Sequence, residues 1–270
     1  MRLIAVGDNV ADTYLDDSVY YPGGQAVNVA VNARRDGARD SAYLGVFGDD
    51  DRAVAIRSCL DEEGVSCARC RTAYAPTAQP GVRLVNGDRT FLSGPRDSCQ
   101  HLLSLRLARE DLELISTYDV CHTTNEAGID ADLARLHDVA PVSYDFSVNR
   151  DGKYLEDVCP CIDIAFFSGS DLLDDDVAAL AQNARRLGVE VAVVTMGERG
   201  SMCACAEGTV FQDACETDLV DTMGAGDAFA AAFLVSYFDS RDIRASMAFA
   251  AKRAAKACTL HGAFGHPHRI

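Results

Sequence analysis

Short apolar runs alternate along this chain with segments of helical spacing, and no other feature constrains the fold as strongly. The apolar runs are partly β-branched, are bounded by Gly or Asp, and predict buried strands at residues 3–6, 42–47, 141–146, 162–167 and 189–195. Segments 26–35, 53–63 and 177–187 are each closed by Gly and predict helices. We therefore expect an α/β fold, one domain over residues 1–270, in which a mostly parallel sheet is covered on both faces. Ligands of such sheets bind beyond the carboxyl ends of the strands.

Residues 82–92 break this pattern, because apolar and polar residues nearly alternate there about Asn86-Gly87. Asn-Gly between two alternating runs is a strong hairpin signal. Residues 14–21 also alternate in part, and we expect a small β lid built from segments of about 13–21 and 79–93. The free edge of such a lid is a template for pairing, so a homodimer through the lid is expected. Residues 266–269 are expected to form a loose terminus.

The charge balance excludes some classes of partner. Forty-one acidic and twenty-five basic residues give a formal net charge of −16, which repels nucleic acid and anionic membranes. No apolar run approaches the roughly 20 residues needed to span a bilayer. The eleven cysteines are odd in number and scattered, which fits a reducing cytoplasm. If the ligand is a nucleotide, backbone N–H groups, helix N-termini, a metal or a few cationic side chains must meet its phosphates locally.

Residues 221–227, Asp-Thr-Met-Gly-Ala-Gly-Asp, lead into an Ala-rich segment that favours a helix. Gly224, Ala225 and Gly226 can present consecutive N–H groups to a phosphate, an anion hole made without lysine. Asp227 would lie in the first helical turn, where it is placed to accept a proton from an attacking hydroxyl. The alternative is structural: Asp227 as an N-cap, and the glycines as a tight turn.

Two further turns contain Gly next to a predicted element. Thr195, Gly197 and Gly200 follow an apolar strand and could hold a nucleotide's ribose and phosphates, or simply turn the chain. At the other end, Gly23 and Gly24 precede a helix whose first turns carry Gln25 and Asn28. The glycines are either a hinge or a cap, and Asn28 is either a ligand contact or a core amide.

Taken in order, these motifs resemble the ribokinase, or PfkB, family of carbohydrate kinases over nearly the whole chain. The resemblance rests on an early Gly-Asp, Gly-Gly-x-x-x-Asn, Thr-x-Gly-x-x-Gly and Asp-Thr-x-Gly-Ala-Gly-Asp. It implies a ribokinase-like three-layer α/β/α sandwich and transfer of the ATP γ-phosphate to a sugar hydroxyl, with Mg2+ as cofactor. Asp227 is then the base. The candidate acceptor-binding residues are Asp8, Asp12, Gly23, Gly24, Gln25, Asn28 and Arg89, and the candidate nucleotide-binding residues are Ser168, Thr195, Gly197, Gly200, Ala251 and Ala255.

Within that family the chain is most similar to the fructoselysine 6-kinases. The residues behind this are 7–14, 48–51, 77–79, 87–89, 144–147 and 261–263. The likeness implies that the acceptor is fructoselysine or a related fructosamine, phosphorylated at C6. Two alternatives stay open: a kinase for a ketohexose, a ribose-type sugar or a nucleoside, and a non-catalytic sugar or nucleotide sensor.

One departure from the family concerns the metal. Where relatives carry Asn-x-x-Glu to organise magnesium through water, this chain has Ser168-Gly169-Ser170-Asp171. Asp171 could still serve through an outer shell, since magnesium prefers oxygen ligands and keeps waters. The resemblance also implies a monovalent cation such as K+ at Asp221, which alternatively caps the loop. Ala251 and Ala255 either leave room for an adenine face or allow close helix packing.

Overall fold

The computed structural model of this chain describes residues 1–85, 88–92 and 96–270. Its centre is a large sheet whose strands, in chain order, are β1 (Arg2–Gly7), β4 (Asp40–Phe47), β5 (Arg71–Thr72), β8 (Val120–Thr124), β9 (Val142–Asp145), β10 (Ile164–Ser168), β11 (Val191–Thr195), β12 (Ser201–Cys205) and β13 (Gly208–Gln212). The order across the sheet is β13-β12-β11-β10-β9-β8-β1-β4-β5. The strands from β11 to β5 run parallel, while β12 and β13 are antiparallel additions at one edge.

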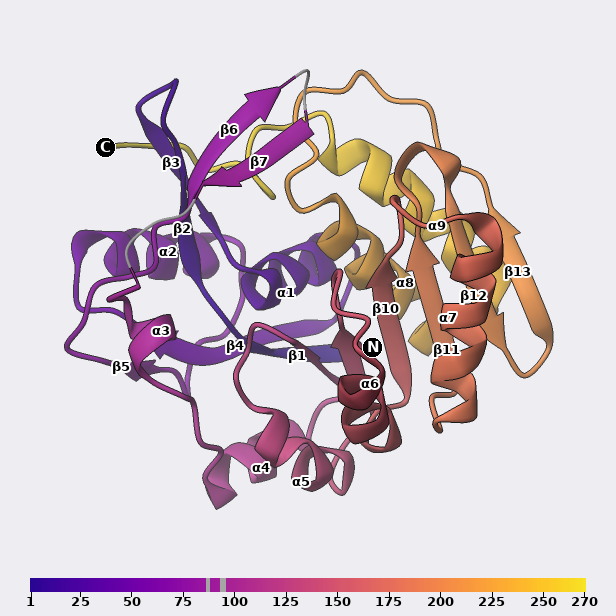
Figure 1. The fold of residues 1–270 in the computed structure, drawn as a ribbon. Coiled ribbons are helices and arrows are strands. Elements are labelled where there is room, and N and C mark those ends of the chain that lie inside the picture. Colours follow the sequence, from indigo (N-terminus) through magenta and orange to yellow (C-terminus); the bar gives the residue numbers. More distant parts are fainter. Residues whose placement is uncertain (86–87, 93–95) are drawn as a thin grey trace.

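Helices cover both faces of this sheet (Figure 1), and each face has its own apolar cluster. One cluster takes in α1 (Gln25–Arg35), α2 (Asp51–Glu62), α8 (Ala225–Ser240) and α9 (Ile243–Ala257). The other takes in α4 (Arg109–Ile115), α5 (Leu133–His137), α6 (Gly152–Val158) and α7 (Asp174–Arg186), while α3 (Cys99–Leu102) contacts β4. Among the described residues no helix is both long enough and apolar enough to cross a membrane. The mostly parallel, doubly covered sheet predicted from the alternation of elements, and the three-layer α/β/α sandwich implied by the family resemblance, are therefore confirmed.

A second, smaller sheet stands beyond the carboxyl end of β1 (Figure 1). It consists of β2 (Val10–Tyr14), β3 (Val19–Gly23), β6 (Gly81–Val85), β7 (Asp88–Leu92) and β14 (His268–Arg269), in the order β14-β3-β2-β6-β7. Strands β6 and β7 are antiparallel, as the predicted hairpin requires. Its expected turn, Asn86-Gly87, lies outside the described residues.

Segment 14–21 contains the end of β2, a turn at residues 15–18 and the start of β3, and these two strands pair antiparallel in the second sheet. The sequence expectations differ from the structure at residues 266–269 and at β8. Residues 266–269 do not form a loose terminus, because β14 pairs with β3 and the His268 ring stacks on Tyr20. Strand β8 was not anticipated, since its second half is His122-Thr123-Thr124. These polar residues are nevertheless fully buried between neighbouring strands of the central sheet.

Candidate active site

The residues that follow β1 hold the start of helix α1. The Asp8 carboxylate accepts the backbone N–H groups of Gln25 (3.0 Å) and Ala26 (3.2 Å), which are free donors of the first helical turn. Gly24 caps this helix with a φ of 106°, and a Cβ there would lie 2.8 Å from the Asn9 Cα atom. Burial raises the pKa of Asp8 against the effect of these hydrogen bonds. Asp8 thus orients the helix that carries the next site residues.

Asp12 is a buried carboxyl on β2, only 3% exposed, and its side chain has no hydrogen bond to any residue the structure describes. Gly23 leaves room for it, because a Cβ at that position would lie 2.1 Å from Asp12 Oδ2. Burial, followed by repulsion from Asp8 and Asp227, raises the pKa of Asp12 to about 8. A buried carboxyl without a partner indicates a group that a ligand completes.

The 221–227 loop is organised by its first residue. Asp221 is fully buried, and its carboxylate accepts the N–H of Met223 (2.9 Å), the N–H of Gly262 (2.9 Å) and the Tyr14 hydroxyl. Gly224 is left-handed, with a φ of 71°, and a Cβ there would lie 2.4 Å from the Ala263 Cβ. The loop is thereby pinned against residues 262–263 just before helix α8.

Helix α8 begins at Ala225, whose N–H donates to the Thr222 carbonyl at 3.2 Å, while the N–H groups of the next residues in this first turn have no intrahelical acceptors. A Cβ added to Gly226 would meet no heavy atom within 4 Å, so there is open space beside this first turn. The positive end of the helix dipole faces the same space. This is the geometry of an anion site at a helix N-terminus.

Asp227 meets Asn28 at the point where α8 crosses α1. Asn28 Nδ2 donates to Asp227 Oδ2 at 2.7 Å, and the two residues are 3% and 8% exposed, respectively. Burial, followed by repulsion from Asp145, raises the pKa of Asp227 to about 7, although the Asn28 hydrogen bond acts in the opposite direction. A carboxylate of this pKa can accept a proton near neutral pH. Asp227 and Asn28, which the sequence analysis named separately as site candidates, are therefore brought together across 199 residues of chain.

Several amide side chains in α1 and just after β1 and β8 keep a buried oxygen without a hydrogen-bond partner among the described residues. The nitrogen of Asn28 donates to Asp227, and that of Asn9 donates to the Tyr43 hydroxyl and to the carbonyl of Val46. Each amide oxygen is therefore left as an acceptor. The atoms concerned are Asn9 Oδ1, Gln25 Oε1, Asn28 Oδ1 and Asn125 Oδ1.

Sequence reasoning had missed Asn9, Asn125 and Asp145 as members of this site. Asn9 and Asn125 each come just after a parallel strand, and Asp145 ends one. Burial raises the pKa of Asp145 to about 6, and its charge in turn raises the pKa of Asp227. The available signal was position alone: polar residues at the carboxyl ends of parallel strands gather at one edge of the sheet.

Arg89 connects the small sheet to the 221–227 loop. From β7, its Nη1 donates to the Thr222 carbonyl at 3.0 Å and to the Thr222 hydroxyl at 3.2 Å. Its charge also lowers the pKa of Asp12 and of Asp227, against the larger effects that raise them. Arg89 is thus the cation that faces both carboxyls from the second sheet.

The predicted nucleotide turn lies at the carboxyl ends of β10 and β11. The Gly169 N–H donates to the Thr195 carbonyl at 2.8 Å, and a Cβ on Gly197 would lie 3.7 Å from the Ser170 Cβ. Gly197 is exposed and Thr195 is half-buried. Gly200 is buried against β13, since a Cβ there would lie 2.2 Å from the Gln212 carbonyl oxygen, which is a packing reason for this glycine.

On α9, Ala251 is 7% exposed and Ala255 is half-buried. The Ala255 carbonyl accepts the Thr217 hydroxyl at 2.8 Å, which ties the segment before the 221–227 loop to α9. The nucleotide roles predicted for these two alanines remain predictions.

Asp171 does not present a free carboxylate to a metal. Arg150 Nη1 donates to Asp171 Oδ2 at 2.9 Å and Nη2 donates to Oδ1 at 2.6 Å, while Nη2 also donates to the Ser168 carbonyl. These hydrogen bonds lower the pKa of Asp171 to about 2. Within residues 1–85, 88–92 and 96–270, no group of three or more His, Cys, Asp or Glu side chains could hold a metal ion. The residues therefore do not fit a magnesium ion held by Asp171 while this ion pair stands.

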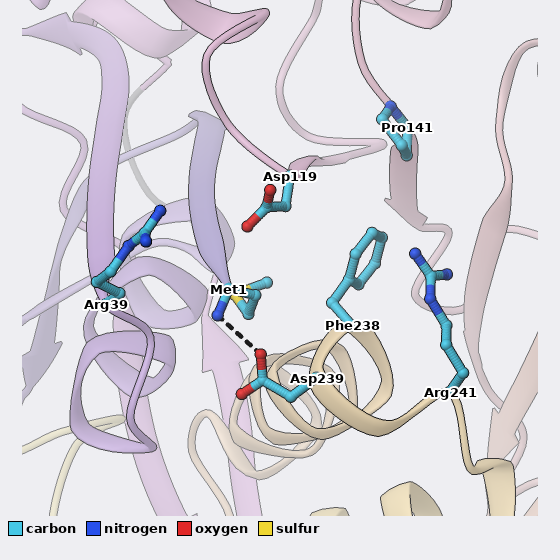
Figure 2. A pocket seen from close by; sticks show the side chains of 7 residues that line it. All are labelled: Met1, Arg39, Asp119, Pro141, Phe238, Asp239 and Arg241. Atoms are coloured by element: carbon cyan, nitrogen blue, oxygen red, sulfur yellow. Dashed lines mark hydrogen bonds and ion pairs between the residues drawn. The ribbon is translucent and has the colours of Figure 1, made fainter.

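A separate pocket lies at the opposite edge of the sheet, where β1 begins and α8 ends (Figure 2). In this pocket the α-amino group of Met1 forms an ion pair with the Asp239 carboxylate at 2.8 Å. None of the predicted site residues lines it, and its lining consists of Met1, Arg39, Asp119, Pro141, Phe238, Asp239 and Arg241.

Comparison with known proteins agrees with this geometry. The family model described as "pfkB family carbohydrate kinase" matches residues 1–267. The chain is 40% identical to fructosamine kinase FrlD of Bacillus subtilis (strain 168), over 100% of this chain and 96% of that protein. It is 31% identical to fructoselysine 6-kinase of Escherichia coli (strain K12), over 97% and 99%, respectively.

Solved structures share the fold. Arabidopsis thaliana ribokinase complexed with ribose and ATP superposes with a TM-score of 0.82 at 20% identity, covering 97% of this chain and 94% of that one. A fructokinase double mutant from Vibrio cholerae O395, in its fructose, ADP and potassium ion bound form, has a TM-score of 0.77 at 22% identity, with coverages of 98% and 94%.

Proposed function

Since this chain belongs to the pfkB family of carbohydrate kinases and is an ATP-dependent sugar kinase, we propose that its acceptor is a fructosamine, foremost fructoselysine, phosphorylated on the C6 hydroxyl. A fructosamine is a ketose sugar whose C1 carries an amine, and that amine is protonated near neutral pH.

One observation carries this proposal: the acceptor side of the site holds several acceptors that have no hydrogen-bond partner among the described residues. They are the amide oxygens of Asn9, Gln25, Asn28 and Asn125, to which the buried Asp12 carboxyl adds a further group. Unpartnered buried polar atoms are costly, so the ligand that fits must bring donors. A polyol brings O–H groups and a protonated amine brings N–H groups and a positive charge, which Asp12, Asp145 and Asp227 would stabilise.

The chemistry follows from the arrangement of Asp227. Asn28 holds one carboxylate oxygen, which leaves the other to accept the proton of the attacking hydroxyl. The phosphoryl group would lie over the first turn of α8, where the N–H groups of Gly224 and Gly226 and the helix dipole stabilise its charge; the Ala225 N–H would join them by leaving the Thr222 carbonyl, to which it donates at 3.2 Å. Phosphoryl transfer needs positioning and charge stabilisation more than covalent chemistry, and both are available here.

The other roles are assigned by position. We assign Asp12, Gly23, Gln25, Asn28 and Arg89 to the acceptor, with Asp8 and Gly24 holding the helix that presents them. The nucleotide is assigned to the segment that includes Ser168, Thr195 and Gly197.

Magnesium would enter chelated by ATP, and K+ would lie near Asp221, as a potassium ion is present in the V. cholerae fructokinase structure. The open edge of β7 supports a homodimer through the small sheet, and the eleven free cysteines support a reducing cytoplasm.

Release of ADP across a panel of acceptors, followed by NMR of the product, tests the proposal. The expected result is sugar-dependent ADP release that is most efficient with fructoselysine, and a phosphate on C6. Equal or better efficiency with fructose, ribose or a nucleoside would overturn the fructosamine assignment. Saturable sugar binding with no sugar-dependent ADP would overturn catalysis itself.

A further inference from the structure

Arg150 is a mostly buried cation in the loop between β9 and α6. Its side chain is 20% exposed, whereas that of its partner Asp171 is 65% exposed. The Arg150 Nε atom is buried with no hydrogen-bond partner among the residues described. The Arg150 guanidinium group is therefore paired with one exposed carboxylate, that of Asp171, while its buried Nε–H group donates to no acceptor among the described residues.

This loop lies between the proposed base and the proposed nucleotide turn. The Ser147 N–H donates to Asp145 Oδ1 at 2.7 Å, and the negative charge of Asp145 raises the pKa of Asp227. On the other side, the Ser168 N–H donates to the Ser147 carbonyl at 2.8 Å, and β10 and β11 place Ser168 beside Thr195. The backbone turns sharply here, since Ser147 has a φ of 52°, an uncommon value for a residue other than glycine. Because β10 lies between β9 and β11, a polyphosphate reaching from the proposed nucleotide turn toward Asp227 would run past the carboxyl ends of β10 and β9, where this loop begins.

A second arginine, Arg199, lies in the turn after β11 and is held differently. Arg199 Nη1 donates to the exposed Asp174 carboxylate at 2.6 Å, and its Nη2 donates to the carbonyls of Gly169, Ser170 and Leu172, so it braces the backbone at several points. Arg150 donates to a single backbone carbonyl and otherwise to the exposed Asp171 carboxylate. The Arg150 fork can therefore exchange its carboxylate for another anion without disassembling the loop.

We propose that Arg150 binds the phosphate chain of ATP and supplies there the positive charge that an Asn-x-x-Glu motif would otherwise recruit through magnesium. Asp171 is a positioning residue that holds the guanidinium in place until nucleotide binds. Arginine suits this exchange because its planar fork pairs with phosphate and carboxylate oxygens in the same bidentate way. In a chain with a net charge of −16, it also provides the local attraction that a polyphosphate requires.

Calorimetric binding of adenosine, AMP and ADP in EDTA, without any acceptor sugar, tests this directly. Arg150→Gln should leave adenosine affinity unchanged and weaken ADP about tenfold or more, because lost charge-assisted hydrogen bonds act only on the phosphates. The matched control is Lys153→Gln, which removes an exposed cation whose partner is Asp157. An equal loss for adenosine and ADP, or no loss for either, would overturn the proposal.

Asp171→Asn separates the two roles open to that carboxylate. The proposal expects ADP binding in EDTA to be as tight as in the wild type or tighter, and the Mg2+ concentration for half-maximal ADP binding to be unchanged. A rise in that Mg2+ requirement would mean that Asp171 organises the metal. It would overturn the proposal that the Arg150 guanidinium supplies the positive charge in place of magnesium recruited by this motif. If Arg150→Gln does not fold, Arg150→Lys keeps the charge and should show a smaller loss that still grows with phosphate number. The measurement involves no sugar, so its outcome is independent of the fructosamine proposal.

Discussion

The two halves of the site satisfy their charges in opposite ways. In the proposed acceptor half, Asp12 and Asp227 are buried, their pKa values are raised to about 8 and about 7, and nearby amide oxygens have no hydrogen-bond partners among the described residues. In the nucleotide half, Asp171 is exposed, paired with Arg150, and its pKa is lowered to about 2. The proposed acceptor half thus keeps buried acceptors for a ligand, whereas in the proposed nucleotide half the Asp171 charge is already neutralised by Arg150.

This difference indicates which residues are expected to serve the chemical step and which are expected to serve phosphate binding. Buried carboxyls without partners oppose folding and are retained where a ligand or a reaction uses them. Exposed ion pairs contribute little to stability and can be exchanged readily. Substitutions in the acceptor half should therefore change chemistry and pH dependence, whereas those in the nucleotide half should change affinity for phosphates.

The largest expected effect is at Asp227. Asp227→Asn removes the proton acceptor while keeping the shape of the side chain, so kcat should fall about 10²- to 10⁴-fold. The affinities of the variant for ATP and for the sugar, measured by calorimetry, should remain close to those of the wild type. Turnover of the variant at the wild-type rate would remove Asp227 from the role of base.

The pH dependence of the reaction should follow the same carboxyl. Because Asp227 must be ionised, and burial raises its pKa to about 7, kcat/KM should fall as the pH decreases through about 7. Asn28→Ala removes the hydrogen bond that lowers this pKa, so the midpoint should move to higher pH, and activity at pH 7 should drop about tenfold. A loss of activity with an unmoved midpoint would mean that Asn28 acts on the acceptor alone.

A smaller effect is expected on stability. The pKa of Asp12 is raised from 3.8 to about 8 in the fold, so its ionisation disfavours the folded state increasingly as the pH rises. Asp12→Asn should therefore increase the free energy of unfolding, by about 1–3 kcal/mol more at pH 8 than at pH 5. Urea denaturation of the ligand-free protein at the two pH values measures this. An identical increment at both would contradict the burial argument.

The sequence predicted much of the fold because apolar strands and Gly-capped helices are local signals. Gly37, Gly64 and Gly188 all have positive φ values after their helices, as the pattern required. Strand β8 was missed because His122 and Thr123 are polar, and β14 was missed because its pairing with β3 depends on residues far apart in sequence.

Prediction of the site had a similar limit. The 221–227 loop and the Asn28 helix carry recognisable motifs, so Asp227 and Asn28 could each be named as site candidates, while the hydrogen bond between them had no signal in the sequence. The ion pair between Arg150 and Asp171 has no such signal, because it joins two loops that only the sheet order brings together. Asp8 was predicted to contact the acceptor directly, but its hydrogen bonds are to the start of α1.

The most direct test of the account compares fructoselysine with an N-acylated analogue whose nitrogen cannot be protonated, using binding calorimetry at pH 7 without ATP. The acceptor half, with its buried carboxyls and unpartnered oxygens, predicts that the cationic sugar binds at least tenfold more tightly, since each opposite charge near a buried carboxylate is stabilising. Equal affinity for the two compounds would contradict the claim that this half of the site is built for a donor-rich cation.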